Sequence, residues 1–272
     1  MECKKALVEV AGDLQAAQEF LRKKGQASAD KKAGRIAAEG RVELATGNGI
    51  AVIVEVNCET DFVAMDENFL AFASEAAQLV LANQPADVEQ LMALETSEGG
   101  TFEARRKALV AKIGENINVR RFQIIQPRGQ VFQYVHGMKI GVLVDLEGGD
   151  EQLGKDIAMH VAATNPNYVT DAEVPAEQLE NERRILSEQA EQEGKPAEIV
   201  AKMVEGRLRK YLAEITLVGQ PFVKDPDVTV GKLLQQRSAK VHGLIRLEVG
   251  EGIEKKVENF ADEVQAQIEA SG

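Results

Sequence analysis

Short stretches in which apolar residues alternate with other positions predict β-strands in this chain. The clearest is 50–57, which follows the tetrapeptide Thr46-Gly47-Asn48-Gly49. We predict that 50–57 is a half-buried strand and that 41–45 is its antiparallel neighbour. Asn48 and Gly49 both tolerate positive φ, so they predict the tight turn of a hairpin. Further strands are expected at 119–125, 131–134, 139–146 and 241–249.

Apolar residues that recur every three or four positions predict amphipathic helices elsewhere. The clearest helix spans 67–81, where Asp66 can cap the N-terminus. Its apolar positions include Phe69, Phe72, Ala73, Ala76 and Val80. Other helices are expected at 2–10, 13–24, 103–113, 151–163 and 230–237, with one starting at Pro85 and an amphipathic one running from Glu251 or Gly252 to the C-terminus.

Two segments, 178–193 and 197–212, differ from the rest because they are long, charged and separated only by Gly194-Lys195-Pro196. Their apolar positions complement one another, which predicts an antiparallel helical hairpin that projects from the body. By contrast, 25–40 is rich in Gly, Ala and Lys and has weak periodicity. We expect a linker there, with one helical turn at most.

The order of the elements predicts an α+β fold with antiparallel sheets. A weak internal repeat supports this, because strand, connection, helix and then a later helix and strand occur over 50–125 and again over 139–249. We therefore expect two similar core subdomains, each made of an antiparallel sheet and helices. The helical hairpin is inserted in the second, a small helical module precedes the core, and a helix follows it.

Composition excludes several classes of function. The formal net charge of -12 argues against nucleic-acid binding through counterion release, and a 4% aromatic share leaves little for base stacking. The 2 cysteines cannot form a disulfide framework, and we find neither a signal-peptide core nor a run of about 20 apolar residues, so a cytoplasmic protein is expected. His136, His160 and His242 lie far apart without metal-ligand spacing, so no metal site is expected.

One stretch, 149–155, matches the phosphate-loop pattern G-x4-G-K and lies between a predicted strand and helix. Asp156 stands where a Ser or Thr would hold magnesium, and Asp150 and Glu151 put negative charge where phosphates would lie. We interpret these acids as ordinary residues of a helix N-terminus and the match as a coincidence. His160 is expected to pack within its helix, and with no nucleophile–base pair evident, neither catalysis nor a cofactor is expected.

The segment 56–64 is the strongest candidate for a functional site. Asp61 and Phe62 lie in a short connection between a strand and a helix, where folds often present side chains to other molecules. The pattern also allows Phe62 to fold inward as a core residue and Thr60-Asp61 to act as a helix cap. From the pattern alone, the chain is an α+β binding or scaffold protein.

Several short sequence motifs identify a protein family more specifically than the patterns of apolar residues do. Glu-Val-Asn-Cys-Glu-Thr-Asp-Phe-Val-Ala at 55–64 and Lys-Ile-Gly-Glu-Asn-Ile-Asn at 112–118 resemble translation elongation factor Ts of the bacterial type. Further resemblance, in the same order, is carried by 2–7, 136–137, 157–163, 202–207, 219–222 and 248–252. The resemblance therefore runs nearly from end to end.

This resemblance implies a guanine-nucleotide exchange factor for elongation factor Tu that needs no cofactor and performs no covalent chemistry. It implies that Thr60, Asp61, Phe62 and Val63 contact the GTPase domain of elongation factor Tu, with the Phe62 ring in a pocket between two helices and Asp61 disturbing the bound magnesium. Further contact positions of the family on the core match Ile113, Gly114, His136 and Lys155, and the expected contacts include a further domain of the partner besides its GTPase domain. The alternative is a non-catalytic scaffold or holdase.

The resemblance also implies a division of the chain. The expected parts are a partial ubiquitin-associated-like helical module (1–25), a linker (26–40), a core N-subdomain (41–128), a core C-subdomain (129–170 and 219–250), a helical hairpin of the dimerisation type (171–218) and a C-terminal helical module (251–272). Members of the family normally have about one more helix before Glu2, so the N-terminal module is expected to lack its first helix. Asp156 stands where some members carry histidine. The hairpin implies a possible homodimer.

Overall fold

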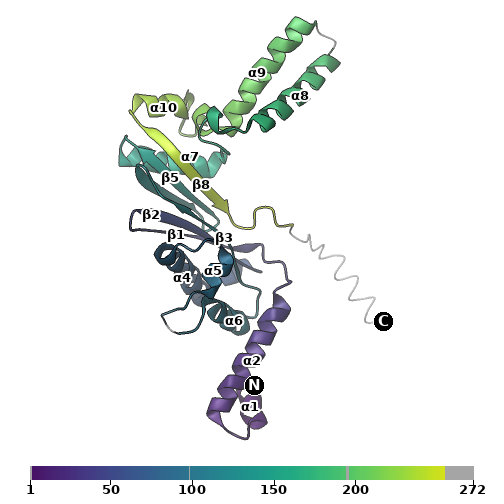
Figure 1. The fold of residues 1–272 in the computed structure, drawn as a ribbon, viewed down its shortest axis with the longest axis vertical. Coiled ribbons are helices and arrows are strands. Elements are labelled where there is room, and N and C mark those ends of the chain that lie inside the picture. The colour runs from purple at the N-terminus through teal and green to yellow at the C-terminus, as the bar shows by residue number, and fades with distance from the viewer. Residues whose placement is uncertain (1, 98, 194–195, 255–272) are drawn as a thin grey trace.

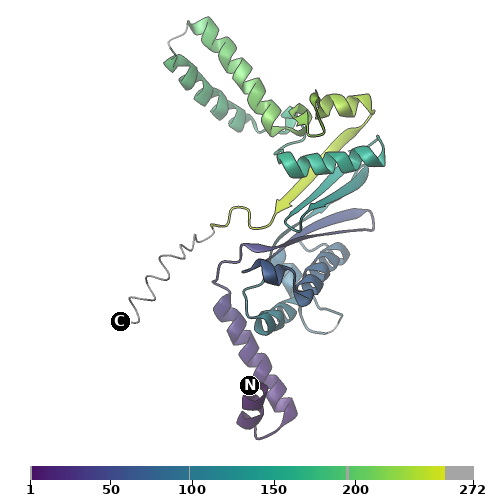
Figure 2. The same cartoon turned by 180° about the vertical axis from the view of Figure 1, so that it is seen from behind.

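The computed structural model describes residues 2–97, 99–193 and 196–254. The molecule is elongated, with two antiparallel sheets in its middle (Figure 1). Helices α1 (Glu2–Glu9) and α2 (Leu14–Lys32) extend from one end, and helices α8 (Ala176–Gln192) and α9 (Ala197–Ile215) extend from the other. The view from behind shows the same order of layers (Figure 2).

The first sheet contains β1 (Glu39–Gly47), β2 (Ile50–Cys58) and β3 (Asn118–Ile125), with β2 in the centre. Asn48 and Gly49 form the turn between β1 and β2 with φ of 52° and 75°, so the predicted hairpin is confirmed. The prediction that 50–57 is half-buried is wrong, because every residue of β2 is buried. One face of β2 is covered by helices and the other by the second sheet, and burial on both faces is usual for a run rich in Val and Ile.

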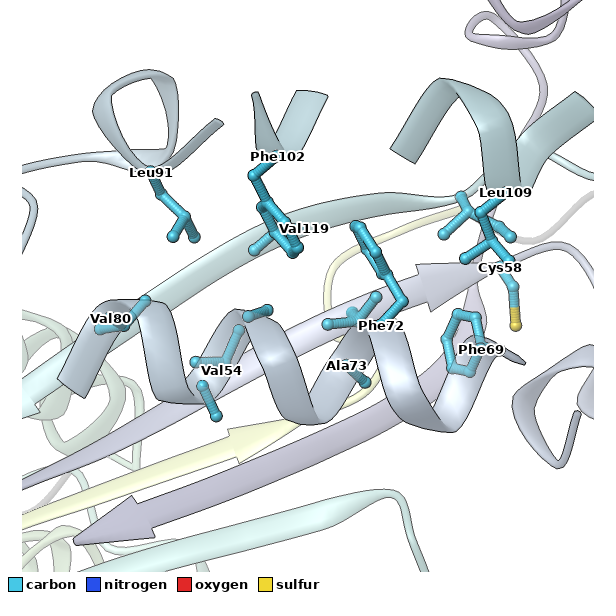
Figure 3. Packing of buried hydrophobic residues seen from close by; sticks show 14 of the residues in the cluster. Val54, Cys58, Phe69, Phe72, Ala73, Val80, Leu91, Phe102, Leu109 and Val119 are labelled. Atoms are coloured by element: carbon cyan, nitrogen blue, oxygen red, sulfur yellow. The ribbon is translucent and has the colours of Figure 1, made fainter. Parts of the chain in front are cut away.

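The outer face of the first sheet is covered by α3 (Asp61–Ala64), α4 (Glu67–Asn83) and α5 (Val88–Ala93), and α6 (Phe102–Ile113) packs on α4 and α5. Asp66 caps α4 as predicted, because its carboxylate accepts hydrogen bonds from the amides of Asn68 and Phe69 at 2.9 and 3.3 Å. The predicted apolar face of α4 is buried. Figure 3 shows how this face meets β2 and α6, where the Phe72 and Phe102 rings stack with centroids 4.5 Å apart.

The second sheet repeats this plan. It contains β4 (Gln130–His136), β5 (Ile140–Glu147) and β8 (Lys240–Glu248), with β5 in the centre and α7 (Glu151–Thr164) on the outer face. From α7 the chain passes through the 3-10 turn η1 (Asp171–Glu173), then α8 and α9, and then the 3-10 turn η2 (Leu217–Gly219). A small hairpin of β6 (Pro221–Phe222) and β7 (Asp225–Thr229) and helix α10 (Val230–Gln236) lead from there to β8. In each sheet the third strand follows the helices, so the expectation of two similar α+β subdomains is confirmed.

The two sheets pack face to face through a small apolar cluster that includes Val42, Ile53, Leu143 and Leu247. A buried carboxylate, that of Glu55, connects the two sheets. The carboxylate of Glu55 accepts hydrogen bonds from Nη1 of Arg120 (3.1 Å), Nε of Arg121 (2.6 Å) and the amide of Gly250 (2.8 Å). Because β3 supplies the arginines and the turn after β8 supplies the amide, Glu55 ties the two subdomains together.

The predicted helical hairpin is confirmed in α8 and α9. Its seam contains Leu186 and Ala190 of α8 and Val204 and Leu208 of α9, all buried. The hairpin projects away from the sheets (Figure 1). At its base, Gln220 accepts a hydrogen bond from Thr164 of α7 and donates one to the carbonyl of Glu214 in α9, which fixes the hairpin to the second subdomain.

The expected linker over 26–40 is wrong in its first half, because α2 continues to Lys32 instead of ending near residue 24. Tertiary contacts explain the difference. A Cβ built on Gly25 would lie 3.1 Å from Cβ of Ala111 in α6, and Ala29 is buried in the core beneath α2. Small residues let α2 approach α6 closely, so a composition typical of linkers belongs here to a packed helix.

The predicted C-terminal helix is absent from 251–254, and its remainder, 255–272, lies outside the described residues. Within 2–97, 99–193 and 196–254, no helix is both long enough and apolar enough to cross a membrane.

A matched pair of glycine substitutions tests the packing of α7 on β4. A Cβ on Gly154 would lie 2.3 Å from Cγ and Cδ2 of the Phe132 ring, whereas a Cβ on Gly206, in α9, would meet nothing within 4 Å. We predict that Gly154→Ala lowers the free energy of unfolding by about 1–3 kcal/mol through overpacking. Gly206→Ala should raise it by about 0.5–1 kcal/mol, because alanine favours helix. Urea unfolding followed by circular dichroism measures both, and stabilisation by Gly154→Ala would contradict the packing described.

Candidate partner-binding site

The end of β2 and the one-turn helix α3 carry the two side chains that the sequence singled out. Thr60 precedes α3 in extended backbone, and its hydroxyl accepts a hydrogen bond from the Val63 amide at 3.4 Å. Asp61 and Phe62 are the first residues of α3 and are both exposed, Phe62 by 79%. Ala64 is buried, so the turn that packs Ala64 against the core directs Phe62 into solvent.

The interpretation of Phe62 as a core residue is therefore wrong, whereas Thr60 does act as a helix cap. The space beneath α3 is already filled, because Cys58 and Phe69 are fully buried there. Leaving a phenylalanine in water forgoes about 1.5–3 kcal/mol of burial energy. Met65, 53% exposed, follows the same helix and enlarges the apolar surface. Contiguous exposed apolar residues typically mark a surface that binds another molecule.

The loop between α6 and β3 lies directly beside this segment. Oε2 of Glu115 accepts hydrogen bonds from the amides of Glu59 and Thr60, both at 3.0 Å, and Oε1 accepts one from the Thr60 hydroxyl at 2.7 Å. In return, Oε1 of Glu59 accepts one from the Asn116 amide at 2.6 Å. Sequence reasoning assigned no role to Glu59 or Glu115, because partners 55–57 residues apart leave no local pattern.

The structure brings some of the predicted contact residues together. Ile113 ends α6, and Gly114 follows it with φ of 94°, a conformation that suits glycine. Both lie one or two residues before Glu115 and are partly exposed. Since Glu115 contacts Glu59 and Thr60, the pair Ile113–Gly114 belongs to the same surface as α3.

The two remaining predicted residues belong to the second subdomain. His136 is exposed at the end of β4, where the following turn contacts β1: the Met138 carbonyl accepts from the Val42 amide, and Lys139 pairs with Glu39 at 2.6 Å. Glu39 pairs in turn with Cys58 across the sheet, so the β4–β5 turn lies at the same end of the core as α3.

Lys155 is separated from that end, because it lies on α7, which covers the outer face of the second sheet. Its ammonium group pairs with Glu151 at 2.6 Å. The structure does not bring Lys155 together with α3.

The phosphate-loop-like stretch 149–155 has a structural explanation. Asp150 caps α7, its Oδ1 accepting from the Leu153 amide at 2.8 Å, which is the kind of donor a phosphate would use. The second glycine of the pattern, Gly154, makes room for the Phe132 ring. Packing and capping account for these residues without a nucleotide.

His160 is buried and hydrogen-bonded, as expected of a packed histidine. Its Nδ1 accepts from the Val223 amide at 3.2 Å, so Nε2 carries the hydrogen and donates to Oε1 of Gln220 at 2.9 Å. Burial lowers the pKa of His160, which favours this neutral form. Among the described residues, no group of three or more His, Cys, Asp or Glu side chains is arranged to hold a metal ion.

Two ionisable groups beside α3 have shifted pKa values. Burial, reinforced by the negative charges of Glu115 and Glu39, raises the pKa of the Cys58 thiol to about 12. The thiol donates to the Thr60 carbonyl at 3.1 Å and stays protonated at neutral pH. The hydrogen bonds from Asn68 lower the pKa of Asp66, so the cap of α4 stays charged. Both shifts belong to groups that support α3, and neither creates a nucleophile.

Comparison with known proteins identifies the family. The family model described as elongation factor TS matches residues 59–251. Elongation factor Ts of Thioalkalivibrio sulfidiphilus is 58% identical over 275 residues, and that of Methylococcus capsulatus is 57% identical over 274; each alignment covers 100% of this chain and 94% of the relative. These matches place the chain among the translation elongation factors. It belongs to the elongation factor Ts family.

The reactivity of Cys58 tests how firmly the segment before α3 is held. In a Cys3→Ser variant, where Cys58 is the remaining cysteine, we predict that labelling with a disulfide reagent at pH 8 is more than about 100-fold slower than for a free thiol, because the thiolate is the reactive form. In about 8 M urea, labelling should become fast, because unfolding exposes the Cys58 thiol to solvent. Rapid labelling of the native protein would mean that this segment opens readily.

Proposed function

We propose that the protein is a guanine-nucleotide exchange factor for elongation factor Tu, and that Phe62 and Asp61 are the residues that promote GDP release. The Phe62 ring enters a pocket between two helices of the GTPase domain. Asp61 weakens the hold of that domain on magnesium. The exchange factor itself performs no covalent chemistry and needs no cofactor.

The observation that carries this proposal is the 79% exposure of Phe62 between elements that are themselves well packed. Membership of the elongation factor Ts family supports the choice of partner. On one side of Phe62 lies the fully buried strand β2, and on the other lies α4, capped by Asp66. A ring held out in this way matches the buried aromatic anchors that dominate many protein interfaces.

The energetics require no further chemistry. GDP is retained through its phosphates and magnesium, so any contact that favours the conformation with weak magnesium binding accelerates release. A wedge shifts the partner toward that conformation only by its difference in affinity for the two states. Burying the Phe62 ring provides roughly 1.5–3 kcal/mol toward this difference. The Asp61 carboxylate, exposed beside the ring, adds a charge that competes for the cation.

The remaining contacts extend the proposed interface over the core. Thr60 and Val63 frame the ring, and Ile113 and Gly114 lie on the same surface through Glu115. His136 lies at the same end of the core. Because Lys155 lies on α7, on the outer face of the second sheet and away from α3, we assign it to contact with a further domain of the partner.

The outer segments have separate proposed roles. We propose that α1 and α2 form a ubiquitin-associated-like helical module, and that α8 and α9 carry the surface that binds a second copy of the chain. The hairpin projects from the body and exposes Ile199 by 47%, which supports this choice. Light scattering measures the oligomeric state.

Removing the ring tests the wedge. We predict that Phe62→Ala lowers kcat/KM for stimulated release of fluorescent GDP from elongation factor Tu by about 30-fold or more, the equivalent of a hot spot of about 2 kcal/mol. Because Phe62 is exposed, the free energy of unfolding should change by no more than about 0.5 kcal/mol.

The matched control is Val223→Ala, which removes a side chain that is 44% exposed in the turn between β6 and β7 of the second subdomain and should leave exchange unchanged. Undiminished release with Phe62→Ala would exclude the wedge. A protein that binds elongation factor Tu without accelerating release at all would be a scaffold or holdase.

The role of Asp61 predicts a dependence on magnesium. Asp61→Asn keeps the shape of the side chain but removes its charge, so stimulated release should fall when magnesium is saturating. When excess EDTA removes magnesium beforehand, the variant and the natural sequence should stimulate release alike. Stopped-flow traces under the two conditions measure this. An equal defect with and without magnesium would show that Asp61 acts through another contact.

A further inference from the structure

Helix α3 alone cannot hold the exposed Phe62 ring in one orientation. Helix α3 has only 4 residues, too few for an isolated helix to be stable. Its cap, the 3.4 Å bond from the Val63 amide to the Thr60 hydroxyl, is long. Something outside α3 must therefore keep Asp61 and Phe62 in one orientation.

The side chain of Glu115 contacts the residues immediately before α3. Its two oxygens accept three hydrogen bonds: from the amides of Glu59 and Thr60 at 3.0 Å and from the Thr60 hydroxyl at 2.7 Å. Hydrogen bonds to a charged acceptor are roughly twice as strong as neutral ones. The residues immediately before Asp61 are thus held by a carboxylate from another part of the chain.

The bond to the Thr60 hydroxyl also orients the helix cap. A hydroxyl has one hydrogen to donate and two lone pairs that accept. Once the hydrogen points to Oε1 of Glu115, a lone pair is free to face the Val63 amide. Glu115 therefore acts on both the backbone before α3 and the first turn of α3.

Glu115 is itself firmly placed. Gly114 turns the chain at the end of α6 with φ of 94°, and the next residue, Asn116, is buried. The Asn116 amide donates to Glu59 at 2.6 Å, and its side chain donates to the carbonyls of Ala33 and Arg35 at 3.3 and 2.7 Å. The loop at 114–116 thus connects the start of α3 with the residues that follow α2.

We propose that Glu115 is a positioning residue for nucleotide exchange, which holds Asp61 and Phe62 in the orientation that engages the partner. This inference rests on the proposed function. Without the Glu115 carboxylate, α3 samples several orientations, and the apparent affinity falls by the fraction of molecules in the competent one. Glu115 itself does not contact the nucleotide or its magnesium.

Hydrogen exchange in the free protein tests the positioning without the partner. In Glu115→Ala, the amides of Glu59, Thr60 and Val63 should exchange at least about 10-fold faster than in the natural sequence, while those of β2 should not change. Glu115→Gln retains an oxygen that accepts from the two backbone amides, so it should restore much of the protection. Unchanged protection at all three amides in Glu115→Ala would overturn the inference.

A mutant cycle that combines Glu115→Ala with the pair Phe62→Ala and Asp61→Asn tests the link to exchange. Glu115→Ala should lower kcat/KM for GDP release by about 5- to 50-fold in the natural background. In the Phe62→Ala, Asp61→Asn background it should have no further effect, because the residues it positions are already gone. An equal, multiplicative loss in both backgrounds would show that Glu115 acts independently of α3, which contradicts the inference.

The matched control is Glu103→Ala. Glu103 is in the first turn of α6, where it pairs with Arg106 at 2.6 Å, and no described hydrogen bond or ion pair joins it to α3. It should leave both exchange and amide protection near α3 unchanged, with thermal unfolding confirming that each variant is folded at the assay temperature. If Phe62→Ala has no effect, the proposed function fails; if Phe62→Ala is defective and Glu115→Ala is not, only the positioning role fails.

Discussion

The buried carboxylate of Glu55 is the constraint that relates one half of this molecule to the other. It lies in the middle strand of the first sheet, fully buried, where an unpaired charge would be very costly. Arg120 and Arg121 of β3 and the amide of Gly250 satisfy it, so the order of β2 and β3 and the docking of the second sheet are linked. Asp145 has a similar place in the second sheet, where it accepts from the amides of Arg128 and Gly129. Each central strand thus carries one buried acid next to a β-bulge.

This arrangement also determines where the exposed pair can lie. Because β2 and β3 are held side by side, the residues that follow β2 meet those that precede β3, and Glu59 and Glu115 can exchange hydrogen bonds. The core beneath α3 is full, so Phe62 has no place inside it. The raised pKa of Cys58 and the lowered pKa of His160 keep both buried side chains in their neutral forms.

Much of the fold follows from local signals. Asn48-Gly49 predicted a hairpin, Asp66 a helix cap, and the spacing of apolar residues predicted α4, α7 and the helical hairpin; all are present. The errors occur where distant residues decide the outcome. The strand β2 is buried on both faces because a second sheet covers it, and α2 runs past Gly25 because α6 packs against it. Neither partner lies within reach of a pattern read along a few residues.

The candidate site divides in the same way. The sequence by itself determined which residues are candidates for the site. The motif around Asp61 and Phe62 resembles a known family, and neighbouring residues predict the connection between strand and helix. The resemblance implied an exposed Phe62 and the local pattern allowed a buried one, and the tertiary structure decided for exposure. It also showed that Thr60 caps a single turn and that Glu115 binds the segment from 55 residues away. The physical reason is range: turns and caps depend on hydrogen bonds between near neighbours, whereas exposure and orientation depend on which distant side chains fill the remaining space.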